Sequence, residues 1–84
     1  KKIATSKLHD VLLPIIQHTP PPAYRGRLIK IKYITQMSAS HPVFAFFCNH
    51  SDHIRESYKL FLENQIRNHF DFSGVKISLV FKDK

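Results

Sequence analysis

The sequence predicts a two-layer α+β sandwich in which two amphipathic helices cover one face of a three-stranded sheet. Two stretches carry apolar residues at helical spacing, and three shorter stretches have the apolar pattern of strands. These five segments follow one another in the order helix–strand–strand–helix–strand. With 84 residues there is room for one compact core, so we expect residues 1–84 to form a single domain.

The first helix is expected to begin at Thr5 or Ser6, either of which can cap it. Pro14 lies inside the helical pattern and removes the hydrogen bond to the Asp10 carbonyl, so we expect a kink. The pattern continues past the proline, and residues 19–22 (Thr-Pro-Pro-Pro) then end the helix. The apolar stripe consists of Leu8, Val11, Leu12, Ile15 and Ile16.

Two strands are expected to follow the proline-rich stretch. Leu28 to Thr35 alternates between two faces, and Val43 to Asn49 is apolar on both, which is typical of a central strand. A loop of small and polar residues, 37–42, joins them. In the first strand we expect Ile29, Ile31 and Tyr33 on the inner face and Leu28, Lys30, Lys32 and Ile34 on the outer face.

The second helix can be capped by Ser51 or Asp52, and Glu63 and Arg67 form an i,i+4 pair on its wet face. A turn over 71–74 leads to the last strand. The buried stripe of the helix is expected to be Ile54, Tyr58, Phe61, Leu62, Ile66 and Phe70.

The last strand is expected over Val75 to Lys82. Its inward residues are Val75, Ile77, Leu79 and Phe81. Because helical and strand periods agree, we predict one continuous core that contains Leu12, Ile16, Phe44, Phe46, Phe61, Leu62, Ile77 and Leu79.

Three stretches, in order and without gaps, resemble one known family. Residues 20–36 (PPPAYRGRLIKIKYITQ) resemble its "PPP…GRxIKIxYxTQ" segment, and residues 56–67 (ESYKLFLENQIR) resemble its "ESYxxYLENxxR" helix. Residues 72–81 (FSGVKISLVF) resemble its closing "FxGxPIxLxFR" strand, and residues 5–8 (TSKL) resemble its "STSxLN" opening. The chain is therefore similar to the C-terminal KH-like domain of the Der (EngA) family of bacterial ribosome-assembly GTPases.

The resemblance implies a KH-like fold with a mixed sheet and a longer parent protein, of which this chain is a fragment. In that parent, two GTPase domains that hold GTP and Mg²⁺ precede the KH-like domain. The family acts in the cytoplasm, in late assembly of the large ribosomal subunit. Its C-terminal domain lies against the GTPase domains, which rearrange with nucleotide state.

The glycines exclude two kinds of site in this chain. A P-loop needs two glycines five residues apart, and here Gly26 and Gly74 are 48 apart, so we expect no GTPase activity in this fragment. A nucleic-acid-binding KH domain clamps the backbone with a GxxG loop, which this chain lacks. Binding of RNA in the usual KH manner is therefore not expected.

A short cluster of Cys48, His50 and His53 has residue types that bind zinc. No second ligand group stands at a matching spacing, and a strand end followed by a capping turn explains the cluster better than a metal site does. We expect no metal and no cofactor in the fragment. The single cysteine also excludes an intrachain disulfide framework and fits a reducing compartment.

Positive charge is the main functional signal. The net charge is +7, and residues 1–34 hold seven Lys or Arg against one acid, whereas residues 35–84 hold six against five. An uneven basic surface is typical of proteins that bind polyanions, although it can also serve only solubility. We expect a basic patch on the sheet face that the helices leave open, made of Arg25, Arg27, Lys30, Lys32, Lys76 and Lys82.

Two functions stay open. In the first, the basic patch engages phosphates of ribosomal RNA in the large subunit, with added stacking by Tyr24, or docks on the parent's own GTPase domains, or does both in turn. In the second, the domain contacts only proteins: it docks on the parent's GTPase domains, or on another partner, without touching RNA. The apolar runs are too short for a membrane segment, and we expect a cytoplasmic monomer.

Overall fold

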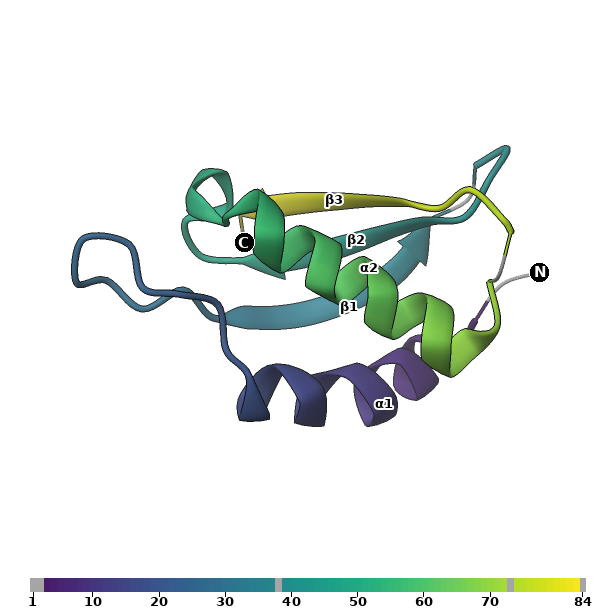
Figure 1. The fold of residues 1–84 in the computed structure, drawn as a ribbon, viewed down its shortest axis with the longest axis horizontal. Helices are drawn as coiled ribbons and strands as arrows, with labels where there is room; N and C mark the ends of the chain where they lie inside the picture. Colours follow the sequence, from purple (N-terminus) through teal and green to yellow (C-terminus); the bar gives the residue numbers. More distant parts are fainter. Residues whose placement is uncertain (1–2, 38, 73, 84) are drawn as a thin grey trace.

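The computed structural model describes residues 3–37, 39–72 and 74–83. Ser38 and Ser73, which the sequence assigned to a loop and a turn, lie outside the described residues. The elements follow in the order α1 (Thr5–His18), β1 (Ile31–Met37), β2 (Val43–Cys48), the 3₁₀ turn η1 (Ser51–His53), α2 (Glu56–Phe70) and β3 (Ser78–Asp83). Figure 1 shows α1 and α2 against the sheet and a long loop that projects from one end between α1 and β1.

The three strands form one mixed sheet in the order β1-β2-β3. β2 pairs antiparallel with β1 and parallel with β3, and the parallel connection passes through η1 and α2. The predicted α+β class with three strands and two main helices is confirmed. Among the described residues, no helix is long and apolar enough to cross a membrane.

The core lies between the helices and one face of β2. Phe44 and Phe46 are fully buried, as are Leu8 and Leu12 of α1 and Leu62 of α2, and all belong to one cluster. Since both helices pack on the same alternating set of β2 side chains, they cover the same face of the sheet. The predicted core is confirmed, with six residues buried and Phe61 and Leu79 packed partly buried against them.

α1 begins at Thr5, but the capping prediction is wrong. Ala4 occupies the N-cap position without a side-chain hydrogen bond. The Thr5 hydroxyl instead lies 3.2 Å from the hydroxyl of Thr35 in β1, so this side chain ties the helix to the sheet. Pro14 lies inside the helix and is exposed, and the helix continues past it to His18 as predicted.

β1 differs from the prediction in both bounds and orientation. A register shift between Ile31 and Tyr33 leaves Lys32 without a partner in β2. One extra residue exchanges the two faces of a strand from that point on. Ile34 is therefore fully buried and Tyr33 is 37% exposed, the reverse of the expected pattern, and Leu28 is 66% exposed ahead of the strand.

The start of α2 was also predicted wrongly. Ser51 and Asp52 belong to η1, which is separated from α2 by Ile54 and Arg55, and Arg55 is the N-cap. Ile54 is buried, so the chain anchors itself in the core before the helix begins. The predicted pair of Glu63 and Arg67 is present, with a nitrogen–oxygen distance of 3.1 Å.

β3 begins three residues later than predicted. Val75 is 42% exposed, and its N–H donates to the Phe72 carbonyl at 3.1 Å. Arg67 of α2 donates to the carbonyls of both Phe72 and Val75, which holds these two residues near the helix. The inward placement of Ile77, Leu79 and Phe81 is confirmed.

Candidate nucleic-acid and partner interface

The loop between α1 and β1 ends in a tight arginine-bearing turn. The backbones of Tyr24 and Arg27 exchange two hydrogen bonds, of 3.0 and 2.9 Å, and the two residues between them are Arg25 and Gly26. Both have positive φ, 50° and 78°, as a type I′ turn requires. Gly26 adopts this geometry without strain, whereas Arg25 adopts it as a non-glycine residue. We call residues 24–27 the arginine turn.

Asn49 fixes the base of this loop to the sheet. Its side-chain oxygen accepts from the Lys30 N–H at 2.6 Å, and its side-chain amide donates to the Leu28 carbonyl at 3.1 Å. Its own N–H donates to the Lys30 carbonyl at 3.3 Å. One side chain thus extends the pairing of β1 and β2 past their ends, and the loop leaves the sheet in a defined direction.

The tip of the loop is fixed by a ring stack. The rings of Tyr24 and His53 lie 3.8 Å apart at an interplanar angle of 5°. The Arg25 guanidinium lies 5.4 Å from the Tyr24 ring centroid, within the range of a cation–π contact. Guanidinium, phenol and imidazole from two segments therefore meet at one end of the molecule.

His53 is in turn held by the end of β3. The Asp83 carboxylate accepts from the Ser51 N–H at 2.8 Å, which fixes η1 against the strand. This hydrogen bond, together with the nearby His50 and His53, lowers the pKa of the Asp83 carboxyl below its ordinary value. The bond between Ser51 and Asp83 thus positions η1 against β3, and with it the His53 ring that stacks on Tyr24.

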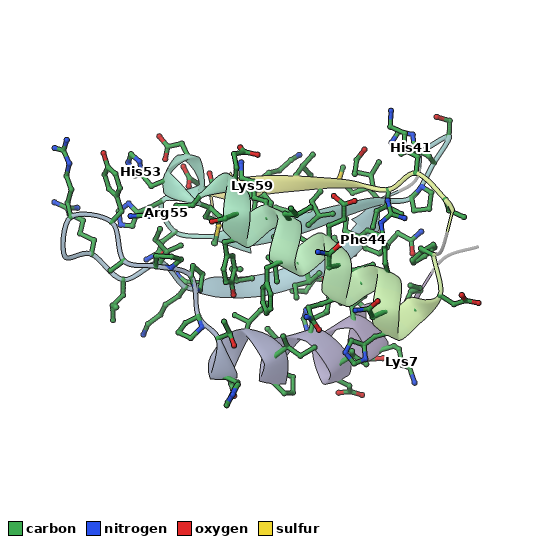
Figure 2. The ribbon with its side chains drawn as sticks, in the orientation of Figure 1. Lys7, His41, Phe44, His53, Arg55 and Lys59 are labelled. Atoms are coloured by element: carbon green, nitrogen blue, oxygen red, sulfur yellow. The ribbon has the colours of Figure 1, made fainter. Side chains whose placement is uncertain are left out.

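Arg55 adds charge at the same end. Figure 2 shows His53 and Arg55 at the end of the molecule from which the loop projects, where η1 leads into α2. Arg25, Arg27, Lys30 and Arg55 are all exposed. We call this end, with these four cations, the basic end. From the sequence, His53 was considered only as a metal ligand, and Arg55 was not singled out, because neither stands in the run of charges around β1.

The six predicted cations do not form one surface on the sheet. Arg25, Arg27 and Lys30 lie at the basic end, and Lys82 lies near it, since the last residues of β2 and β3 pair there. Lys76 precedes β3 at the opposite end of the strand, and Lys32 lies at the bulge of β1. All six are exposed, but only the first three share the projecting loop.

The open face of the sheet is mostly apolar, and Lys82 is the predicted cation that strand alternation places on it. The bulge in β1 turns Tyr33 outward, next to its partner Phe47 with ring centroids 5.9 Å apart. Met37 is 39% exposed and Val80 is partly buried on the same face. By strand alternation the open face consists of Tyr33, Thr35, Met37, Val43, Ala45, Phe47, Ser78, Val80 and Lys82.

The Cys48 and histidine cluster has no features of a reactive or metal-binding site. Cys48 is fully buried at the end of β2, and burial, with a smaller contribution from the Asp83 charge, raises the pKa of its thiol to about 11. A thiol with a raised pKa stays protonated and unreactive near neutral pH. In the described part of the chain, no group of three or more His, Cys, Asp or Glu side chains could hold a metal ion.

Comparison with known proteins adds the following. Residues 2–82 match the family described as KH-domain-like of EngA bacterial GTPase enzymes, C-terminal. The chain is 54% identical over 84 residues to a GTPase Der of Christiangramia forsetii, and 52% identical over 83 residues to a GTPase Der of Porphyromonas gingivalis. It is 45% identical over 84 residues to a GTPase Der of Amoebophilus asiaticus. These matches cover 99–100% of this chain but only 19% of each relative.

Proposed function

The chain belongs to the family of C-terminal KH-like domains of EngA bacterial GTPases, and from this premise we propose that it is a binding module of a GTPase that acts in ribosome biogenesis. In the proposed parent, other domains bind GTP and Mg²⁺ and hydrolyse the nucleotide in the cytoplasm. This chain has no P-loop and contributes binding rather than catalysis. We propose that its basic end engages ribosomal RNA of the large subunit through phosphates.

The observation that carries this proposal is the arginine turn. Arg25 and Arg27 project on a loop whose base is fixed by Asn49 and whose tip is fixed by the stack of Tyr24 on His53. A guanidinium forms paired hydrogen bonds with phosphate oxygens, and a loop that is already ordered loses little entropy on binding. The basic end thus has the charge and the preorganisation that phosphate contacts require.

The same structure supports binding that is weak and indifferent to sequence. The chain between η1 and α2 is Ile54-Arg55, so no glycine loop can approach an RNA backbone there. Phosphate contacts carry no sequence information, and a few of them give micromolar or weaker affinity near physiological salt. We expect all single-stranded RNAs of equal length to bind alike, with affinity that falls as salt rises.

A charge-reversal experiment tests this function. Fluorescence anisotropy with a labelled RNA, measured across a salt series, should show weaker binding and a shallower salt slope for Arg25→Glu/Arg27→Glu. The matched control is Lys7→Glu/Lys76→Glu, which makes the same change in net charge at exposed positions outside the basic end. Equal losses in both variants would show that only net charge matters, and tight binding of a single sequence would reveal a base-reading site.

A second candidate function is docking on the parent's GTPase domains. The apolar open face favours it, because exposed apolar patches in a chain that spans a fifth of the length of its relatives are expected to be covered by the rest of the protein.

Met37 is the only methionine of the chain, so its oxidation by hydroxyl radicals reports on this face alone. Its oxidation should be slower in the full-length parent than in the 84-residue chain, whereas Leu28 should be oxidised equally in both. Equal oxidation of Met37 would exclude docking through this face.

A further inference from the structure

The outer edge of β3 has free backbone groups. β2 occupies one side of β3, where the Ser78 N–H donates to the Pro42 carbonyl at 3.0 Å. In a parallel pair, alternate residues direct their backbone groups to the partner, so Leu79 and Phe81 direct theirs to the other side. Among the residues that the structure describes, no hydrogen bond reaches these outward groups. β3 is therefore an edge that can accept another strand.

The opposite edge of the sheet is partly covered by α1. The Ile34 N–H of β1 donates to Nε2 of His9 in α1 at 3.0 Å, and the Ile3 N–H donates to the side-chain oxygen of Gln36 at 2.7 Å. The bond to His9 thus occupies one outward backbone group of β1. β3 is a short strand that carries the exposed Lys82, and its outward backbone groups remain available to a further strand.

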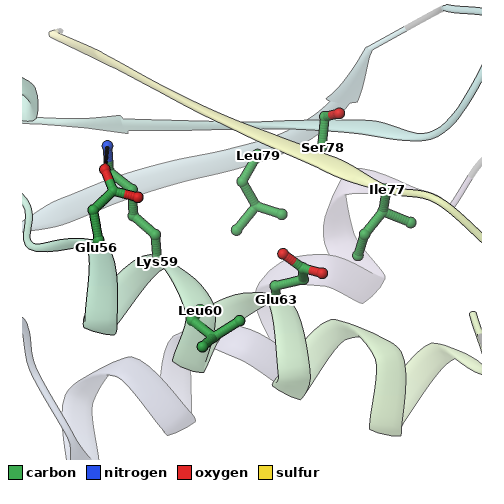
Figure 3. Close-up of a pocket in the computed structure, with 7 residues that line it drawn as sticks. All are labelled: Glu56, Lys59, Leu60, Glu63, Ile77, Ser78 and Leu79. Atoms are coloured by element: carbon green, nitrogen blue, oxygen red, sulfur yellow. Dashed lines mark hydrogen bonds and ion pairs between the residues drawn. The ribbon is translucent and has the colours of Figure 1, made fainter.

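A groove runs between this edge and α2. It has a volume of about 310 Å³, with Glu56, Lys59, Leu60 and Glu63 on the helix wall and residues 77–79 on the strand wall. Figure 3 shows the two walls facing each other. Leu60 of the helix wall is 57% exposed, so its side chain is accessible beside the strand edge. The groove therefore offers an apolar contact beside a free strand edge.

The charges of the groove differ from those of the rest of the molecule. The chain has six acidic residues and a net charge of +7, yet Glu56 and Glu63 both lie on the helix wall. The Lys59 ammonium forms an ion pair with the Glu56 carboxylate, with a nitrogen–oxygen distance of 3.4 Å, and lies 5.3 Å from the Phe81 ring centroid. The Arg67 guanidinium forms an ion pair with the Glu63 carboxylate, with a nitrogen–oxygen distance of 3.1 Å. The Glu56 side chain remains 91% exposed. Each glutamate thus has a cation of the chain beside it, and the exposed Glu56 carboxylate is the charge that a cationic side chain of a partner can reach most easily.

We propose that an extended polypeptide segment, in which basic residues alternate with β-branched apolar residues, adds to the free edge of β3 as a fourth strand. Main-chain hydrogen bonds to Leu79 and Phe81 hold such a segment, and side-chain contacts select it. Its basic residues face α2, where their aliphatic stems cover Leu60 and their charges reach Glu56 and Glu63. Its apolar residues continue the open face beside Val80.

A second copy of this chain fits the edge less well. Antiparallel pairing of β3 with itself would bring Lys76 and Lys82 of both copies to one seam, and both residues are exposed. Like charges in cross-strand proximity are destabilising. A basic partner segment instead meets the two glutamates of α2, so the charges favour a different polypeptide.

The test uses the 84-residue chain and two blocked heptapeptides, one alternating Lys and Val and the other alternating Glu and Val. Two-dimensional NMR should show that the Lys peptide shifts the amide signals of Leu79 and Phe81 and slows their hydrogen exchange in proportion to the fraction bound. The Glu peptide should do neither. Because the chain carries a charge of +7, nonspecific attraction would favour the Glu peptide, so a preference for the Lys peptide cannot arise from net charge.

Matched variants locate the contact. Leu60→Lys places a positive charge in the groove and should abolish the response, whereas Leu28→Lys makes the same change at a site that is 66% exposed and remote from the groove. The proposal is overturned if the Glu peptide binds as well as the Lys peptide, or if the Lys peptide leaves Leu79 and Phe81 unchanged. It is equally overturned if a uridine oligonucleotide shifts those two signals, because the groove would then be a nucleic-acid site.

Discussion

Tyr24 and His53, which are 29 positions apart in the sequence, lie face to face with ring centroids 3.8 Å apart. The contact joins the tip of the loop between α1 and β1 to the segment that leads into α2. It carries the Arg25 guanidinium on its outer side. The direction in which the two arginines project thus depends on one ring pair that neither helix nor strand period could indicate.

Replacement of this ring should loosen the arginine turn without unfolding the domain. In Tyr24→Ala the stack, the cation–π contact and the packing of this partly buried ring against the core are lost, which we expect to cost about 1–2 kcal/mol of global stability. Hydrogen exchange of the Arg27 amide should become faster, and RNA affinity should fall. Tyr24→Phe keeps the ring and is the control. It should behave as the unsubstituted 84-residue chain does. An unchanged Arg27 amide in Tyr24→Ala would show that the turn is held by its own backbone bonds.

Removal of the Asn49 side chain should detach the base of the same loop. Asn49→Ala loses the bonds to the Lys30 N–H and the Leu28 carbonyl, and we expect a cost of about 1–3 kcal/mol in the free energy of unfolding. Asn68→Ala, an exposed change on α2, should shift stability by about half a kcal/mol or less. Urea unfolding of both variants measures the difference. Equal stabilities would mean that water replaces the Asn49 side chain without loss.

The sequence predicted the layers of this fold because periodicity reports on burial. Helical spacing identified Leu12 and Leu62, and strand patterns identified Phe44 and Phe46, since each segment buries one face. The bulge at Lys32 was not predictable, because a single inserted residue leaves no mark on the residue types around it. That one residue decided which side chains form the open face.

Part of the candidate site could likewise be predicted from the sequence, and part could not. The Arg25-Gly26-Arg27 run was visible as charge, but its geometry depends on Asn49 and His53, which lie far away in sequence. Arg25 takes a left-handed conformation that sequence rules assign mainly to glycine and asparagine. The β3 edge was likewise hidden, since its free backbone groups follow from strand order rather than from residue type.

Alkaline pH should destabilise the domain through its buried thiol. The pKa of Cys48 rises from 9.0 to about 11 on folding, so the unfolded chain releases this proton first. The stabilisation is fully present below pH 9 and is lost as pH rises toward 11, by up to about 3 kcal/mol. Burial also raises the pKa of Tyr58, from 10.0 to about 12, so a second loss begins above pH 10.

The cysteine contribution can be separated by its slope. In Cys48→Ala the free energy of unfolding should depend less on pH between 9 and 10 than in the parent sequence, and the decline above pH 10 should remain. Chemical denaturation at half-unit pH steps measures both curves. Because the substitution also opens a small cavity, the slopes rather than the absolute stabilities are compared. Parallel curves between pH 9 and 10 would show that the folded thiol ionises as easily as the unfolded one.

Replacement of Pro14 by alanine should stabilise the domain. Pro14 lies inside α1 and is exposed, so its ring contributes little packing while it removes one helical hydrogen bond and crowds the turn around Asp10. A proline in a helix interior costs about 3 kcal/mol relative to alanine, and roughly 1 kcal/mol of that is returned because proline restricts the unfolded chain. We therefore expect Pro14→Ala to gain about 2 kcal/mol, which raises Tm by on the order of 10 °C in a domain of this size.

Pro20→Ala is the matched control, since Pro20 is exposed but follows the end of α1. There the substitution only frees the unfolded chain and should lower Tm slightly. Thermal unfolding of the two variants beside the parent sequence gives the comparison. If the Tm of Pro14→Ala is no higher than that of Pro20→Ala, the helix already accommodates its proline without cost. The expected kink at Asp10 is then the feature to measure, through the exchange rates of the α1 amides. If it exceeds Pro20→Ala by the expected margin, Pro14 is a local destabiliser of α1, the helix that also covers part of the edge of β1 through His9.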